Sequence, residues 1–93
     1  MSCSVRYHPD VRDKDIPKID KAMRQRIKSA IELRLMTEPE KYGEPLRRTL
    51  KGYRKLRVGD YRIVYKIENQ YIFILGIAHR KIVYERMEWR KGH

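Results

Sequence analysis

Hydrophobic and polar residues alternate through two stretches near the middle of the chain, residues 53–58 and 61–67, and this period of two is typical of β-strands. Gly59 and Asp60 lie between the two stretches, and glycine supplies the positive φ that a type II′ turn needs at its first central position. With these two residues as the loop, the pairing of the strands is fixed, since facing residues share one side of the sheet. The pattern therefore predicts an antiparallel hairpin of known register.

This register separates the hairpin into two unlike faces. One face is apolar except for Arg54 and carries Leu56, Val58, Tyr61, Ile63, Tyr65 and Ile67. The other is basic and carries Tyr53, Lys55, Arg57, Arg62 and Lys66 around a single Val64. Arg57 and Arg62 face each other, and such a like-charge pair is destabilising by roughly 0.2–1 kcal/mol unless an anion lies between them. We expect the first face to be core and the second to be either a solvated basic surface or an anion-binding one.

The N-terminal part of the chain predicts one strand and two helices. Residues 2–7 alternate as a first strand, and residues 10–16 predict a short polar helix that Pro17 stops or kinks. Asp20 is a suitable N-cap for a longer helix that ends near residues 37–39. Apolar side chains recur along that helix at three- and four-residue spacing, at Met23, Ile27, Ala30, Ile31 and Leu35. This stripe is expected to face the sheet.

The segment between the second helix and the hairpin, residues 39–49, is expected to be a loop that delivers Leu46 and Leu50 to the core. After the hairpin, a turn at residues 69–70 leads into a strand over residues 71–78. That strand is apolar on both faces, so it is expected to be covered on both sides along part of its length.

A final helix is predicted over residues 82–89, and residues 90–93 are expected to fray. The side chains expected to pack inward from it are Val83, Met87 and Trp89. Together the elements predict a single α+β domain over residues 1–93, with an antiparallel sheet of about four strands, two N-terminal helices on one face and a short C-terminal helix. This length is expected to give one modest core and no second domain.

The charge balance of the chain indicates what kind of partner it binds. The chain has 23 Lys and Arg against 12 Asp and Glu, a formal net charge of +11, which favours a polyanionic partner. The charge is spread over predicted helices and strands instead of one amphipathic helix, so nucleic acid is favoured over a membrane surface. Because the sequence has no apolar run long enough to cross a bilayer and no signal peptide, we expect a cytoplasmic protein that binds no membrane.

The cysteine and histidine residues do not suggest a metal or redox site. Cys3 has no partner for an internal disulfide, and His8, His79 and His93 are too far apart in sequence to suggest a metal site. No metal and no cofactor are expected. Cys3 is predicted to be a partly buried strand residue, since no histidine is placed to activate it as a nucleophile.

The second hairpin extends the basic face. With a two-residue loop, Arg62 would face Ile77, and His79 would project from the basic face just beyond the strand. The residues expected to meet at this end of the sheet are Arg57, Arg62, His79, Arg80 and Tyr84. Such a cluster suits phosphoryl transfer on RNA, in which cations stabilise a crowded anionic phosphorane and a titratable group moves a proton. A one-residue slip would send His79 to the opposite face.

Three runs of residues resemble the RelE/ParE superfamily of bacterial toxins: Leu50-x-Gly52-Tyr53, Leu56-Arg57-Val58-Gly59-Asp60-Tyr61-Arg62-Ile63-Val64-Tyr65 and His79-Arg80-x-x-Val83-Tyr84. The order of elements is similar as well, over most of the chain and least before Asp20. The resemblance implies a RelE-like fold and the toxin of a toxin–antitoxin pair. In the RelE branch it implies a metal-independent endoribonuclease that cuts mRNA in the ribosomal A site by attack of a 2′-hydroxyl on the adjacent phosphodiester. The implied partners are an acidic antitoxin and the ribosome with its mRNA.

The same resemblance implies roles for individual residues. Arg62 matches the arginine that holds the scissile phosphate, Lys55 a catalytic basic residue, and Arg80 an arginine after the last strand. Tyr84 matches the tyrosine that stacks on or orients a base, although it stands two residues closer to Arg80 than in RelE itself. RelE also has a lysine where this chain has Tyr53, so one cation is missing here.

Residues 44–53 are more similar to the YoeB relatives, which implies that Glu44 acts as general base and His79 as general acid. Glu44 is alternatively a loop carboxylate paired with a nearby arginine, and either Glu44 or Lys55 could be the base. Side chains expected to contact the RNA are Arg47, Arg48, Tyr53, Arg54, Arg57 and Lys66.

Two other functions stay open. A ParE-like toxin would inhibit DNA gyrase by binding it and would cleave nothing, but ParE-like chains generally lack the ensemble seen at His79, Arg80 and Tyr84. A basic RNA-binding or ribosome-associated module would bind without cutting. The nuclease is therefore the leading prediction.

Overall fold

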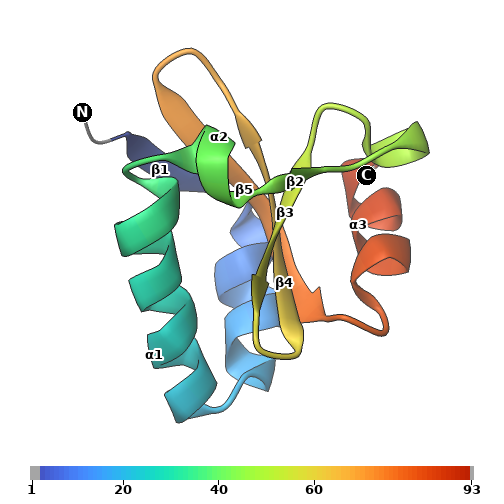
Figure 1. Ribbon diagram of the computed structural model, residues 1–93. Helices are drawn as coiled ribbons and strands as arrows, with labels where there is room; N and C mark the ends of the chain where they lie inside the picture. The colour runs from blue at the N-terminus through green and yellow to red at the C-terminus, as the bar shows by residue number, and fades with distance from the viewer. Residues whose placement is uncertain (1–2, 93) are drawn as a thin grey trace.

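A five-stranded sheet forms the centre of the computed structural model, which describes residues 3–92 (Figure 1). In chain order the strands are β1 (Ser4–Tyr7), β2 (Glu44–Pro45), β3 (Arg54–Val58), β4 (Tyr61–Ile67) and β5 (Tyr71–His79). Their spatial order is β1-β5-β4-β3-β2. The α+β class is confirmed, but the sheet is mixed, because β1 runs parallel to β5 while the other neighbours are antiparallel. Residue 2 of the expected first strand lies outside the described residues.

The helical segments are η1 (Val11–Asp15), η2 (Ile16–Lys18), α1 (Lys21–Ala30), η3 (Ile31–Leu35), α2 (Pro39–Tyr42), η4 (Arg48–Leu50) and α3 (Val83–Lys91). Asp20 caps α1 as predicted, by accepting a hydrogen bond of 2.8 Å from the Met23 N–H. Near Pro17 the first helix changes as predicted: η1 ends at Asp15, and Pro17 lies in the first turn of η2, where no N–H donor is needed. Residues 39–49, expected as a loop, contain α2 and β2. Within residues 3–92 no helix is long and apolar enough to cross a membrane.

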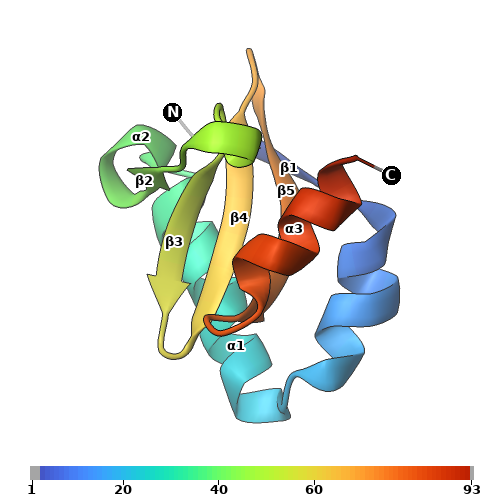
Figure 2. The same ribbon diagram turned by 90° about the vertical axis from the view of Figure 1, so that its right-hand side faces the viewer.

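Helices cover both faces of the sheet, as Figures 1 and 2 show. On one face η1, α1 and η3 enclose a first core of Val11, Ile19, Ile27, Ala30, Ile31, Leu35, Leu56, Val58, Ile63, Tyr65, Ile72, Ile74 and Ile77. On the other face α3 encloses a second core of Leu50, Tyr53, Val64, Leu75, Ala78, Val83 and Met87. β5 contributes to both cores, which confirms that it is covered on both sides.

The first hairpin has the predicted register, with Arg57 opposite Arg62 and Lys55 opposite Val64. Gly59 has a φ of +59°, as the first central residue of a type II′ turn requires. The basic face and the apolar face therefore separate as expected.

The second hairpin departs from its prediction by one residue. From the turn at residues 69–70, the pairing follows the expected register as far as Tyr65. It then shifts by one residue, because Leu75 is an additional residue in β5 and forms a β-bulge. Beyond the bulge His79 faces Tyr61 and lies on the side of the first core. The prediction that His79 and Arg62 share a face is wrong.

The final helix is longer and better anchored than expected. Val83 and Met87 are buried, as predicted, whereas Trp89 is 58% exposed instead of packing inward. Arg90 was expected to fray and is 4% exposed. His93, from the same expected frayed segment, lies outside the described residues.

Candidate active site

Lys55 lies at the centre of a polar cluster on the face of the sheet that α3 partly covers. Its Nζ atom lies 3.1 Å from the Tyr84 hydroxyl oxygen and 3.8 Å from Oε2 of Glu44. Glu44 is the cross-strand neighbour of Lys55 in β2, and Tyr84 comes from the first turn of α3. Three segments of the chain thus bring a carboxylate, an ammonium and a phenol together. The short strand β2, which the sequence pattern did not indicate, is what places Glu44.

Arg57 and Arg62 extend the cluster toward the hairpin turn. Both lie on the same face as Lys55, and they face each other across the hairpin. Nη1 of Arg62 donates to the backbone carbonyl oxygens of Gly59, at 3.1 Å, and Tyr61, at 2.9 Å. These bonds fix the Arg62 guanidinium beside the turn, while Arg57 is exposed. An anion between the two arginines would relieve their mutual repulsion.

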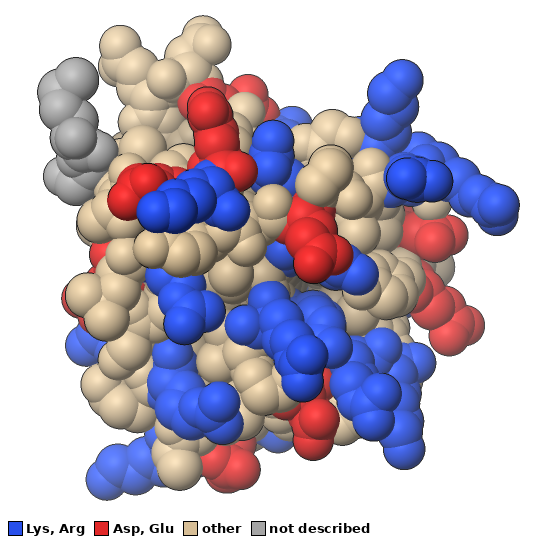
Figure 3. Space-filling model, viewed as in Figure 1, with Lys and Arg blue, Asp and Glu red and all other residues tan. Residues whose placement is uncertain are grey.

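Basic side chains gather over the β3–β4 hairpin in Figure 3. A hollow of about 450 Å³ at this surface is lined by Arg34, Tyr42, Glu44, Lys55, Leu56, Arg57 and Arg62. Arg34 and Tyr42 were not predicted to belong to the site; the Arg34 guanidinium carbon lies 5.7 Å from the centre of the Tyr42 ring. Their proximity depends on how η3 packs against α2, and no local pattern in the sequence signals it.

His79 lies outside this cluster. Its ring packs edge-on against Tyr61, with 5.7 Å between the ring centres, and its Nδ1 accepts a hydrogen bond of 3.2 Å from the Lys81 N–H. The bulge at Leu75 turns His79 away from the face that carries Arg62. The expected convergence of His79 with the arginines is therefore not found.

Arg80 lies near the turn of the first hairpin. Its N–H donates to the Asp60 carbonyl oxygen at 2.8 Å, and its Nε lies 3.5 Å from Asp60 Oδ1. Because Asp60 follows Gly59, Arg80 is held at the same end of the hairpin as Arg62. Its side chain is 54% exposed and open to a ligand.

Three of the residues expected to contact RNA have other environments. Tyr53 is 8% exposed and belongs to the second core, so it is not an RNA-facing side chain in this structure. Lys66, expected to be exposed and unpaired, forms a 2.9 Å ion pair with Glu68, and this hydrogen bond raises the pKa of Lys66. Arg54 lies on the opposite face from Lys55. Its guanidinium donates to backbone carbonyl groups of the segment that contains α2.

Arg47 and Arg48 are exposed on the segment that joins β2 to β3. Arg48 has a φ of +57°, in the left-handed region, which costs a residue other than glycine roughly 1–2 kcal/mol. Contact of these two side chains with an RNA backbone stays a prediction.

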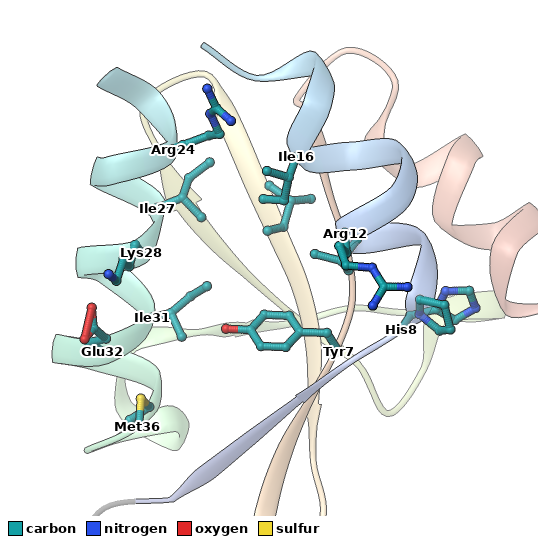
Figure 4. Close-up of a pocket in the computed structure, with 13 residues that line it drawn as sticks. Tyr7, His8, Arg12, Ile16, Arg24, Ile27, Lys28, Ile31, Glu32 and Met36 are labelled. Carbon is teal, nitrogen blue, oxygen red and sulfur yellow. The ribbon is translucent and has the colours of Figure 1, made fainter. Parts of the chain in front are cut away.

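A second, larger hollow lies on the other side of the molecule, between η1 and α1 (Figure 4). Its volume is about 610 Å³, and its apolar lining includes Val11, Ile16, Ile27, Ile31 and Ile77. Arg12, Arg24 and Lys28 lie around it, with Glu32 as the acidic member of the lining. None of the predicted site residues contributes to it.

Among residues 3–92 no three or more His, Cys, Asp and Glu side chains come together as metal ligands would. Cys3 is partly buried beside the first core, as predicted, although β1 begins one residue later.

The comparison with protein families decides the class of the molecule. A family model described as the ParE toxin of the type II toxin–antitoxin system parDE matches residues 5–84. The chain belongs to this toxin family. It is accordingly a toxin of a type II toxin–antitoxin system, and the resemblance to the RelE/ParE superfamily is confirmed.

Individual relatives come from the RelE side of the superfamily. The toxin is 41% identical to Toxin RelG of Mycobacterium tuberculosis over 54 residues, which are 56% of this chain and 62% of RelG. It is 40% identical to Toxin RelE of the same organism over 52 residues, 54% of each chain. The toxin thus spans between half and two thirds of the length of these curated relatives.

Solved structures share the fold of the toxin. The toxin–antitoxin complex RelBE2 of Mycobacterium tuberculosis matches with a TM-score of 0.78 and 30% identity, over 86% of this chain and 93% of that one. The YoeB–YefM complex of Staphylococcus aureus matches with a TM-score of 0.61 and 21% identity, over 85% and 98% of the two chains. The second likeness shows the fold alone.

Proposed function

We propose that this toxin is a ribosome-dependent endoribonuclease that cleaves mRNA without a metal ion. The contact of Lys55 with Tyr84, beside the carboxylate of Glu44, is the observation that carries the proposal. It places a cation in a hydrogen bond of 3.1 Å with a proton donor, Tyr84, and in an ion pair of 3.8 Å with a proton acceptor, Glu44. Arg57 and Arg62 supply positive charge on the same face.

The proposed reaction is an internal transfer of the phosphoryl group. The 2′-hydroxyl of one nucleotide attacks its own 3′-phosphodiester, the bond to the 5′-oxygen of the next nucleotide breaks, and a 2′,3′-cyclic phosphate and a 5′-hydroxyl result. Glu44 accepts the proton of the 2′-hydroxyl, and Arg62 with Lys55 stabilises the phosphorane. The Lys55 ammonium donates to the Tyr84 oxygen, which leaves the Tyr84 proton for the departing 5′-oxygen. Tyr84 thereby takes the role that the resemblance implied for His79.

Cleavage of a translated mRNA tests the proposal. Wild-type toxin, Lys55→Met and Tyr84→Phe would be added to a translation mixture, and cuts would be mapped by primer extension. We expect wild-type toxin to cut mRNA on ribosomes, and both variants to cut at least about 100-fold more slowly, the scale of a lost proton-transfer group. Lys51→Met, a change at an exposed lysine outside the cluster, is the matched control. Cleavage by Lys55→Met at the wild-type rate would show that Lys55 has no part in the reaction.

The alternative is a toxin that binds DNA gyrase and cleaves nothing, and the ParE description of the family model favours it. A gyrase supercoiling assay with the same four proteins separates the two. Inhibition of supercoiling without mRNA cleavage would replace the nuclease by the gyrase inhibitor. Binding of RNA with neither activity would identify a non-catalytic module.

The proposed partners are the ribosome with its mRNA in the cytoplasm, and an acidic antitoxin. The solved RelBE2 structure named above is a toxin–antitoxin complex, which supports the second partner. Two surfaces of this chain suit a segment rich in Asp and Glu: the basic face of the hairpin and the hollow between η1 and α1. The hollow combines an apolar floor, including Ile27 and Ile31, with nearby cations at Arg24 and Lys28, as an amphipathic acidic helix would require (Figure 4).

A further inference from the structure

Arg90, in the last turn of α3, forms a buried ion pair with Asp15 of η1. Its Nη1 lies 2.7 Å from Asp15 Oδ2 and its Nη2 lies 2.9 Å from Asp15 Oδ1, so the pair is bidentate. Arg90 Nε also lies 3.4 Å from Oδ2 of Asp10. Arg90 is 4% exposed and Asp15 is 2% exposed. We call this pair of residues the clasp.

The clasp also binds the backbone of β5 beside the bulge. Asp15 Oδ2 accepts a hydrogen bond of 2.9 Å from the Ile77 N–H, and Arg90 Nη1 donates to the Leu75 carbonyl oxygen at 3.2 Å. β1 pairs with β5 only as far as Ile74, so these two backbone groups lie at the edge of β5 beyond the end of β1. The clasp supplies hydrogen-bond partners for these two groups, which a neighbouring strand would otherwise supply. It therefore links η1 and α3, which lie on opposite faces of the sheet, around the edge of β5 (Figure 2).

Close packing at Gly76 reinforces this attachment. A Cβ atom on Gly76 would lie 2.3 Å from Met87 Sδ and 2.6 Å from Arg90 Nη1, so only glycine permits α3 to lie so near the strand. The bulge, the glycine and the clasp thus act at one place. They determine the height and the rotation of α3 over the sheet.

Stability alone does not account for such a pair. Removing two charges from water costs free energy that their mutual attraction offsets only in part, and apolar residues of similar volume often serve as well. Apolar contacts such as those of Val83 and Met87 hold α3 on the sheet, but they are not directional. A bidentate pair fixes the rotation of the helix as well.

We propose that the clasp positions Tyr84 on Lys55. Tyr84 precedes Arg90 by less than two turns of the same helix, so a rotation at Arg90 moves the Tyr84 hydroxyl away from the Lys55 ammonium, which now lies 3.1 Å from it. Asp15 and Arg90 are positioning residues, remote from the reacting atoms. The effect of the clasp on cleavage rests on the proposed nuclease function; its effect on the contact of Tyr84 with Lys55 does not.

Arg90→Lys tests the clasp, because lysine keeps the charge beside Asp15 but cannot bind it through two parallel hydrogen bonds. Nuclear Overhauser effects between the Tyr84 ring and the Lys55 side chain report the contact, and circular dichroism reports the fold. We expect Arg90→Lys to keep the circular dichroism spectrum of the wild-type protein and to lose the nuclear Overhauser effects between Tyr84 and Lys55. In the nuclease assay kcat should fall about 10-fold or more while KM changes little, as misplacement of a catalytic group predicts. Arg86→Lys, in the same helix, is the matched control and should change neither.

The two readouts separate the proposals. If no protein cuts mRNA but Arg90→Lys loses the Tyr84–Lys55 effects, the nuclease fails and the clasp stands. Effects that persist in folded Arg90→Lys overturn the clasp. Should Arg90→Lys not fold, Asp15→Leu with Arg90→Met, which removes both charges together, decides in the same way. Unfolding of both would also overturn the proposal, since the pair would then serve the fold as a whole.

Discussion

Tyr65 shows how one buried side chain fixes an irregular segment and, through it, a residue of the site. Its ring is 0% exposed, and its hydroxyl donates a hydrogen bond of 2.7 Å to the carbonyl oxygen of Pro39. Gly43 leaves room for this hydroxyl, because a Cβ there would lie 1.8 Å from it. Glu44 is the next residue and starts β2, so the position of the candidate base depends on the phenol of Tyr65.

The same phenol predicts a loss of stability at alkaline pH. Burial raises the pKa of Tyr65 to about 12, against a smaller lowering by Arg54. Below pH 10 both the folded and the unfolded chain keep this proton, so the protonated Tyr65 contributes in full to the free energy of unfolding. Between about pH 10 and 12 only the unfolded chain releases it, and the free energy of unfolding should fall by up to about 2–3 kcal/mol.

Urea unfolding at pH 8, 10 and 11.5 would measure this fall. Tyr7, whose pKa is also raised by burial and by Glu32, contributes in the same direction, so the comparison with Tyr65→Phe is essential. We expect Tyr65→Phe to lose less stability than wild-type protein over the same pH range. Equal losses would show that Tyr65 does not carry the effect.

At the scale of elements, local signals made some of the structure predictable. The register of the first hairpin follows from Gly59 and Asp60, two neighbouring residues whose turn chemistry acts at short range. The N-cap at Asp20 and the apolar stripe of α1 are equally local. The basic face that carries Lys55 and Arg62 could therefore be predicted from the sequence.

Other elements depend on contacts that no local pattern contains. The bulge at Leu75 lies next to Gly76, over which α3 packs, and it places His79 on the other face. β2 exists because residue 44 pairs with Lys55, not because of any alternation of its own. Asp15 was predicted in a short polar helix and Arg90 in a frayed end, since their pairing joins distant parts of the sequence.

Gly76→Ala tests the packing of α3 on β5. The new methyl group would meet Met87 and Arg90, and we expect a loss of about 1–3 kcal/mol of unfolding free energy, typical of an overpacked core. Met87→Ala removes one of the obstructing side chains, so the double variant should be less destabilised than the sum of the single variants. Gly92→Ala is the control, because its Cβ would lie no closer than 3.7 Å to its nearest neighbour. If the losses of unfolding free energy in the two single variants simply added up in the double variant, the new methyl group at residue 76 would not be in contact with Met87.

The molecule as a whole carries a charge of +11, and the two hollows described above lie on different sides. The basic face of the hairpin is suited to a polyanion, whereas the hollow between η1 and α1 combines apolar floor with basic surroundings. RNA and an antitoxin could therefore use surfaces that are separate in space.

Binding of RNA should weaken steeply with salt, while free RNA should be cut poorly. For single-stranded RNA each phosphate contact contributes a slope of about 0.7 in log affinity against log salt concentration, because bound cations release counterions. Arg57→Ala, which removes an exposed arginine, should lower the slope by about 0.7, whereas Lys66→Ala should change it less, since Lys66 is paired with Glu68. Fluorescence anisotropy at 50, 150 and 300 mM salt would measure the slopes. A slope near zero would show that the positive charge of the toxin does not serve RNA binding.

Antitoxin binding should depend on the hollow between η1 and α1. With the toxin's antitoxin as ligand, charge reversal by Lys28→Glu should weaken binding by about 10-fold or more, by juxtaposing like charges. Arg57→Ala should weaken it if the segment also lies across the basic face, and Val83→Ala should do so if the antitoxin displaces α3. Calorimetry at two salt concentrations would compare the four proteins. Unchanged affinity in all three variants would put the antitoxin elsewhere.

The clasp also has a consequence for how a newly made molecule matures. Asp15 and Arg90 are 75 positions apart, and β1 must wait for β5 before it can pair. Chains fold from the N-terminal side as they are synthesised, and contacts this distant in sequence form late. If the clasp positions Tyr84 as proposed, the contact of Tyr84 with Lys55 forms only after residue 90 has been added to the chain. The candidate site would then be among the last parts of the molecule to assemble.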